Sequence, residues 1–194
     1  MLLWQCEACL AALQRGRAES LAARRRYDVR GTAVFIDHQD TFSEFQSALT
    51  FAANASKMLW PRFLRTSERV PAMRRGRRLR YILGIKKRNP ALYSVPTIRN
   101  NFEHLDTRLD AWAERTKVGA IGIHALASDK VLQGERGDRF TRYDQARDSF
   151  LMLEDKIDLK KLETSITQLW RVCAVRFHDI RRYLEQLESP QESK

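Results

Sequence analysis

The sequence lacks any run of about 20 consecutive apolar residues, which is the length that a membrane-spanning helix requires. It also has little cysteine: three residues in a chain of 194, too few for a disulfide framework and typical of a reducing compartment. The apolar segment from Met1 to Ala12 carries Glu7 and has no basic region of the kind that precedes a secretory core. We therefore expect a cytoplasmic protein that has no membrane among its partners.

Three familiar catalytic motifs are also missing: a glycine-rich phosphate loop, a serine-nucleophile elbow and a helical His-Glu-x-x-His zinc motif. The cysteines leave one metal site open, because Cys6 and Cys9 have the spacing that lets two thiolates share a zinc ion with Cys173 and His178. Both pairs lie within patterns of continuous amphipathic helix, which favours thiols buried as small apolar groups. We expect no metal and no cofactor.

What the chain does have is positive charge. Its 35 Lys and Arg residues against 24 Asp and Glu residues give a net charge of +11. Hydrophobic residues make up 43% and charged residues 30%, a balance typical of folded proteins. A surface with this excess attracts polyanions before any specific contact forms, so nucleic acid is the first partner to consider.

Apolar residues at helical spacing predict five helices. The predicted helices are residues 2–27, a second from Asp40 to Pro61, a short basic helix after Pro71, residues 96–116, and a long helix capped by Asp158. The predicted core face of the second helix comprises Phe42, Phe45, Leu49, Ala52, Ser56 and Leu59. The predicted stripe of the last helix comprises Leu159, Leu162, Ile166, Leu169, Cys173, Phe177, Ile180, Leu184 and Leu187.

The region 118–153 has a different pattern. Ile121 and Ile123 alternate with smaller or polar residues, and Phe140 follows two glycines, which together predict a small β-hairpin insertion. The expected fold is mainly α: a helical bundle of about five helices with this insertion. We expect a single domain over residues 1–188 and a disordered tail over 189–194.

A cluster of cations lies between Pro71 and Pro90. The cluster comprises Arg74, Arg75, Arg77, Arg78, Arg80, Lys86, Lys87 and Arg88. It predicts a track for the RNA backbone, with Tyr81 and Tyr93 available to stack on bases. The alternative is a basic surface that only improves solubility.

The segment Arg99-Asn100-Asn101-Phe102-Glu103-His104 holds the residues best suited to chemistry. With Phe102 on the core side of the predicted helix, His104 points away from the core. An imidazole moves protons near neutral pH, and a guanidinium presents a planar fork to phosphate oxygens. RNA supplies its own nucleophile in the 2′-hydroxyl, so a phosphodiester site of this kind needs no metal.

This Arg-Asn-x3-His spacing resembles the signature of the HEPN (higher eukaryotes and prokaryotes nucleotide-binding) superfamily. The resemblance implies a helical bundle and a metal-independent endoribonuclease of toxin–antitoxin, phage-defence or CRISPR systems. It implies a homodimer in which two motifs face one another, with Arg99 and His104 as the catalytic pair and Asn100 orienting them. An acidic antitoxin or regulatory protein is then a further expected partner.

Two other interpretations stay open. The segment is also compatible with a solvated helix face, on which Arg99 pairs with Glu103 and His104 faces water; such a pair stabilises a helix by only about 0.2–0.5 kcal/mol. The chain as a whole is compatible with a non-catalytic helical module that binds RNA or an acidic partner protein.

Overall fold

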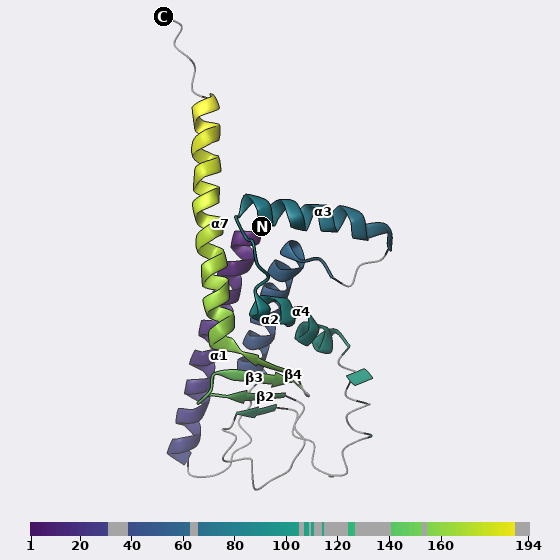
Figure 1. The fold of residues 1–194 in the computed structure, drawn as a ribbon. Coiled ribbons are helices and arrows are strands. Elements are labelled where there is room, and N and C mark those ends of the chain that lie inside the picture. The colour runs from purple at the N-terminus through teal and green to yellow at the C-terminus, as the bar shows by residue number, and fades with distance from the viewer. Residues whose placement is uncertain are drawn as a thin grey trace, which may run out of the picture.

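Five long helices and a four-stranded sheet make up the described part of the chain in the computed structural model (Figure 1). The structure describes residues 1–30, 39–62, 66–104, 107–108, 110, 114, 124–126, 141–152 and 155–188. The helices are α1 (Leu2–Arg30), α2 (Gln39–Leu59), α3 (Thr66–Ile82), α4 (Pro90–Glu103) and α7 (Leu159–Glu188). The strands are β1 (His124–Leu126), β2 (Thr141–Asp144), β3 (Ser149–Met152) and β4 (Asp155–Asp158). The expectation of a mainly α fold with a small β element is confirmed.

Helix α2 lies at the centre of the bundle, packed against α1 on one side and α4 on another (Figure 1). The six positions predicted for its core face are all buried, as the helical spacing requires. Helix α1 also packs against α7, so α1 joins α2 to the last helix of the chain. The predicted position of α1, and the predicted position and buried face of α2, are therefore confirmed.

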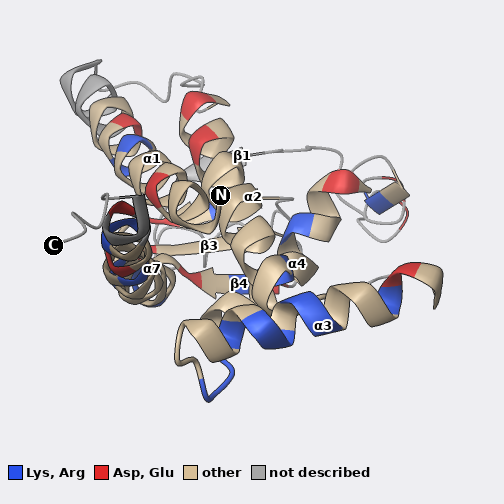
Figure 2. Cartoon of the chain, turned by 90° about the horizontal axis from the view of Figure 1, so that it is seen from above, with Lys and Arg blue, Asp and Glu red and all other residues tan. Residues whose placement is uncertain are grey.

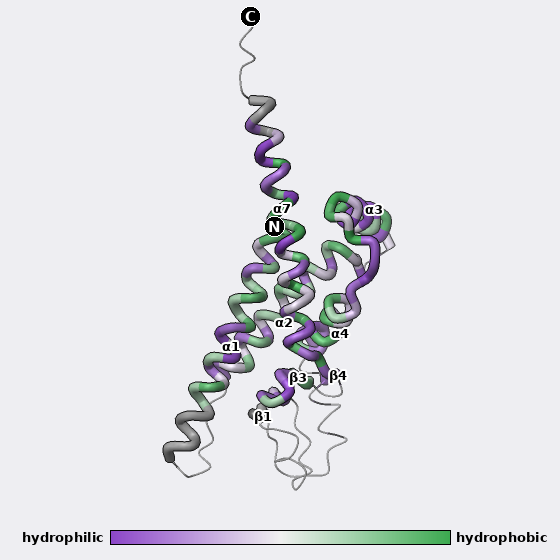
Figure 3. Tube along the Cα trace, turned by 60° about the vertical axis from the view of Figure 1, so that its left-hand side comes forward, coloured by the Kyte–Doolittle hydropathy of each residue, from purple (hydrophilic) through white to green (hydrophobic). Residues whose placement is uncertain are grey.

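The start of α7 is capped as predicted, because Asp158 Oδ1 accepts a 2.8 Å hydrogen bond from the Lys161 backbone N–H. The apolar stripe of α7 is buried from Leu159 to Cys173. Beyond that point the prediction is wrong: Phe177 and Ile180 are 61% and 52% exposed. Helix α7 continues past the first turn of α1, so this half of the stripe lies outside the bundle (Figure 3).

The sheet has the order β1-β2-β3-β4, with β1 parallel to β2 and the other neighbours antiparallel. Thr141 lies opposite Met152 in the β2–β3 hairpin, and Ser149 lies opposite Asp158 in the next pair. The predicted hairpin is confirmed, but the sheet continues past the predicted boundary at residue 153. Ile121, Ile123, Phe140 and the predicted tail at 189–194 lie outside the described residues.

Aromatic side chains join the sheet to the helices. The ring of Tyr143 on β2 lies 4.4 Å from that of Phe45 on α2, and the ring of Phe150 on β3 lies 5.8 Å from that of Phe42. Both strand residues are buried. Edge-to-face and tilted ring pairs at such distances add to the stabilisation that burial itself provides. The sheet is therefore part of the main core rather than an appendage to it.

A second junction is ionic. Arg17 on α1 pairs with Asp148 at 2.7 Å and with Glu163 on α7 at 2.9 Å. The Tyr143 hydroxyl donates a 2.8 Å hydrogen bond to Asp148, which lies in the hairpin turn with a φ of 46°. The Asp148 side chain thus holds an unusual backbone conformation in place through two partners. One arginine ties the hairpin to the first and last helices.

Helix α4 differs from the predicted helix at both ends. It begins at Pro90, because Asn89 caps it by accepting a 3.2 Å hydrogen bond from the Leu92 N–H, and it contains Pro96 in its interior. It ends at Glu103, with His104 as the C-cap. The predicted range 96–116 is therefore right for residues 96–103 and wrong in its first residue and in its continuity past Glu103, although Thr107, Arg108, Asp110 and Glu114 are again helical. Helix α3 likewise begins at Thr66 and contains Pro71, instead of starting after that proline.

Candidate nucleic-acid interface

The Arg99–His104 segment forms the last turn of α4 together with its cap. Asn101 is buried in this turn, and its side-chain amide donates a 2.8 Å hydrogen bond to Asp155 at the start of β4. The ring of Phe102 lies 6.1 Å from that of Phe150 on β3. These two contacts fix the inner side of the turn to the sheet and leave its other side chains toward the surface.

Arg99 is held by Glu103, one turn later on the same helix. Arg99 Nη1 lies 2.5 Å from Glu103 Oε1, and the Arg99 side chain is 22% exposed. The sequence leaves open whether Arg99 pairs with Glu103 or turns toward His104, and the structure places it on Glu103. A phosphate group would therefore have to compete with this carboxylate for the guanidinium.

His104 is exposed, as the helical spacing predicts. Its backbone N–H caps α4 by donating to the Asn100 carbonyl oxygen at 3.2 Å. Among the residues that the structure describes, its imidazole has no hydrogen bond or ion pair. Asn100 is partly buried. The structure thus brings the three predicted catalytic residues into one helical turn, with the imidazole open to solution and the guanidinium engaged.

Lys57 on the last turn of α2 belongs to the same area and was not predicted from the sequence. Its ammonium group is partly buried, and this burial together with nearby Arg99 lowers its pKa, whereas Glu103 acts in the opposite direction. The positive charges of Lys57 and Arg99 therefore oppose one another in this area, and the Glu103 carboxylate offsets them. No pattern in the sequence links Lys57 to Arg99, because the contact depends on how α2 and α4 pack.

The outer surface of α3 carries exposed arginines (Figure 2). Arg74, Arg77 and Arg78 are spaced three to four residues apart and therefore lie on one face of the helix, which we call the arginine face. Tyr81 follows one turn later on the same face and is 86% exposed. Within the described residues these three arginines form no ion pair, so their charge is available to a ligand.

The opposite side of α3 is docked on the end of α2. A Cβ atom added to Gly76 would lie 2.7 Å from both the Leu59 carbonyl oxygen and Pro61 Cδ, so only glycine allows this approach. Arg80 donates a hydrogen bond to the Leu59 carbonyl oxygen. That bond satisfies a backbone group at the C-terminus of α2, where a cation is favourable. Arg80, predicted as part of the RNA track, therefore has a structural partner.

The predicted cation Arg75 is also exposed on α3, and the loop between α3 and α4 supplies the last three. Lys86, Lys87 and Arg88 are exposed. The guanidinium groups of Arg88 and Arg62 each lie over the Tyr93 ring, 4.1 Å from its centroid. Tyr93, predicted to stack on bases, is thus engaged by two arginines of its own chain.

The three cysteines are free and buried, which confirms the expectation of small apolar groups. Burial raises the pKa of the Cys6 and Cys9 thiols to about 12 and that of Cys173 to about 11. At neutral pH the three buried thiols therefore keep their protons. In the described ranges no group of three His, Cys, Asp or Glu side chains is arranged to hold a metal ion.

Comparison with known proteins gives no family assignment. No protein-family model matches the chain, and neither a curated protein nor a solved structure matches it at a significant level. Among the described helices, none combines the length and the apolar character needed to cross a membrane. The site must therefore be interpreted from its own geometry.

Proposed function

We propose that this chain binds RNA on the arginine face of α3 and cleaves it, without a metal ion, at the Arg99–His104 segment. One observation carries the proposal: α2 packs against both α3 and α4, the helices that carry the arginine face and the motif. Leu59 in the last turn of α2 accepts the hydrogen bond from Arg80 of α3, and Arg99 of α4 is near enough to Lys57 in the same turn to lower the pKa of its ammonium group. Because both helices are held by α2, a single RNA strand bound on the outer side of α3 is expected to reach the motif by passing round that helix.

The binding step rests on charge. Arg74, Arg77 and Arg78 have no competing carboxylate among the described residues, and the whole chain carries a net charge of +11. Each phosphate that these guanidinium groups neutralise releases bound counterions, which makes the affinity fall as salt rises. This binding step does not depend on the base sequence of the RNA, because phosphate groups carry no sequence information.

The cleavage step rests on His104 and Arg99. The exposed imidazole takes the proton from a 2′-hydroxyl, whose oxygen attacks the adjacent phosphorus. The bond from phosphorus to the 5′-oxygen of the next nucleotide then breaks, and that oxygen leaves with the proton that the imidazolium returns to it. Arg99 stabilises the added negative charge once its guanidinium exchanges Glu103 for phosphate. The anchored Asn101 keeps the backbone of the turn still during this exchange.

The HEPN resemblance extends the proposal to oligomeric state and context. It supports a homodimer with two motifs facing one another, and a cellular role as a toxin or defence effector. An acidic antitoxin that covers the arginine face would silence such an enzyme. These are proposals that co-purification and molecular-mass measurement test directly.

The experiment compares two histidine variants in a cleavage assay with labelled single-stranded RNA in EDTA. His104→Ala is expected to abolish cleavage, whereas His178→Ala, which removes another exposed imidazole on α7, is expected to leave it unchanged. Circular dichroism checks that both variants are folded. Undiminished cleavage by the His104→Ala protein would remove the enzymatic proposal.

The second candidate is a non-catalytic RNA-binding module, which the Arg99–Glu103 ion pair favours because it occupies the guanidinium. In this case the wild type binds RNA and does not cut it. Glu103→Gln removes the competing charge and is expected to tighten RNA binding by about two- to fivefold at low salt under either candidate. Asp40→Asn is the control, since it removes one negative charge in the first turn of α2, at the end of that helix away from Lys57. Equal affinity of the two variants would show that Arg99 does not contact RNA.

A further inference from the structure

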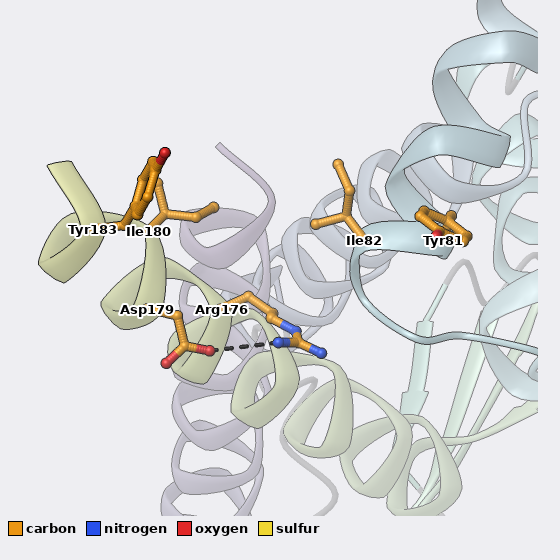
Figure 4. A pocket seen from close by; sticks show the side chains of 6 residues that line it. All are labelled: Tyr81, Ile82, Arg176, Asp179, Ile180 and Tyr183. Atoms are coloured by element: carbon orange, nitrogen blue, oxygen red, sulfur yellow. Dashed lines mark hydrogen bonds and ion pairs between the residues drawn. The ribbon is translucent and has the colours of Figure 1, made fainter. Parts of the chain in front are cut away.

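A groove separates the C-terminal end of α3 from the half of α7 that projects beyond α1 (Figure 4). Its volume is about 590 Å³. The residues that line it are Tyr81, Ile82, Arg176, Asp179, Ile180 and Tyr183. None of them belongs to the motif segment, so the groove is distinct from the proposed cleavage site.

The lining is aromatic and apolar, with its charges paired. Tyr81 is 86% exposed and Tyr183 is 60% exposed, one on each side of the groove. Ile180 projects from α7 toward the α3 side, where Ile82 stands (Figure 4). Arg176 and Asp179 form a 3.5 Å ion pair along α7, so the carboxylate among these six residues is paired with a cation. Exposed rings on both sides of a groove offer flat apolar faces on which a planar ligand can stack.

The groove is continuous with the arginine face. Tyr81 lies three residues after Arg78 and four after Arg77, which places it on the same side of α3 as both guanidinium groups. A ligand in the groove therefore meets rings at one end and unpaired cations at the next turn. An alternation of phosphates and flat bases matches this arrangement.

We propose that the groove holds unstacked bases of single-stranded RNA, stacked on Tyr81 and Tyr183, while the phosphates lie on the arginine face. The proposal rests on the RNA binding proposed above, and it is independent of cleavage. Stacking on an aromatic ring tolerates every base, because each base has a flat π face. Duplex RNA is excluded, since its bases are already stacked on one another and cannot enter a groove between two helices.

The test measures dissociation constants by fluorescence anisotropy with three labelled probes of equal length. The probes are 2′-O-methyl oligouridine, which cleavage through the 2′-hydroxyl cannot consume, an abasic strand with the same backbone, and a duplex. The wild type is expected to bind oligouridine more tightly than the other two. Tyr81→Ala and Tyr183→Ala are each expected to weaken oligouridine binding about tenfold and to leave abasic binding unchanged.

Matched variants separate stacking from other causes. Tyr81→Phe and Tyr183→Phe keep the ring and are expected to keep the affinity, and Val175→Ala removes an exposed apolar side chain of α7 that does not line the groove. Unchanged oligouridine binding by both alanine variants overturns the inference, as does equal binding of duplex and single strand by the wild type. A third outcome also overturns the inference. If Tyr183→Ala abolishes self-association of the protein and leaves its RNA affinity unchanged, the groove is a contact between two copies of the chain.

The failure of this inference is distinguishable from failure of the proposed function. If replacing Arg74, Arg77 and Arg78 with Gln abolishes binding while both tyrosine variants bind normally, the RNA site stands and the groove is not part of it. If the wild type binds none of the probes at low salt, both proposals fall together.

Discussion

Asn101 and Asp155 form the hydrogen bond that fixes the candidate motif to the rest of the fold. The two side chains meet at 2.8 Å between the last turn of α4 and the first residue of β4. Asn101 lies two residues from Arg99 and three from His104, so its position determines where both of those side chains emerge. A buried polar contact in this place stabilises the protein only as long as both partners are present.

Asn101→Ala is expected to lower the free energy of unfolding by about 1–3 kcal/mol, because it leaves the Asp155 carboxylate without its amide donor. Urea denaturation followed by circular dichroism measures the change. Thr97→Ala, an exposed position on the same helix, serves as the control and is expected to change stability by less than about 0.5 kcal/mol. Equal stabilities for the two variants would mean that the contact does not anchor the turn.

Gly76→Ala is expected to destabilise the protein by about 1–3 kcal/mol, because the new methyl group would overlap the Leu59 carbonyl oxygen and Pro61. The sign of this change in stability is informative, since replacing glycine by alanine within a helix otherwise stabilises a protein by about 1 kcal/mol. Met73→Ala, at an exposed position of α3, provides the comparison. Thermal unfolding of both variants gives the measurement, and a higher melting temperature for Gly76→Ala would contradict the docking of α3 on α2.

Stability is expected to fall as pH rises above about 9, because of the buried thiols. Burial raises the pKa of Cys6 and Cys9 from 9.0 to about 12, so the folded thiols keep their protons while the unfolded ones release them. Each thiol then lowers the free energy of unfolding by up to about 1.4 kcal/mol per pH unit between these values. Urea titrations between pH 8 and 11 measure the slope. A variant with both Cys6 and Cys9 changed to Ala should give a shallower slope, and parallel slopes would show that these thiols are accessible to water.

The sequence predicts helices well where one face repeats regularly and less well where proline is present. For α2 the repeat from Phe42 to Leu59 identifies both the helix and its buried face. For α4 the same reasoning placed the first turn at Pro96, because proline is common there. The true first turn is at Pro90, where Asn89 supplies a cap, and burial of Pro96 in the bundle offsets the backbone hydrogen bond that it cannot donate.

Periodicity also identifies an apolar stripe without identifying what covers it. The positions from Leu159 to Cys173 are covered by the bundle, whereas Phe177 and Ile180 continue the same stripe into solvent. At the candidate site, the sequence indicated an exposed His104, but it did not indicate Lys57, whose place depends on helix packing. Asn101 did leave a signal: it follows Ile98 by three residues, so it is a polar residue on the buried face.

The most direct test of the account is a comparison of two single-stranded substrates of the same sequence, one of RNA and one of 2′-O-methyl RNA. Each is incubated with the wild-type protein in EDTA, and the product ends are analysed by mass spectrometry. Only the RNA is expected to be cut, and the upstream product is expected to end in a 2′,3′-cyclic phosphate, because the 2′-oxygen is the nucleophile. Cleavage of both strands, or of neither at protein concentrations that saturate binding, would contradict the proposed cleavage step.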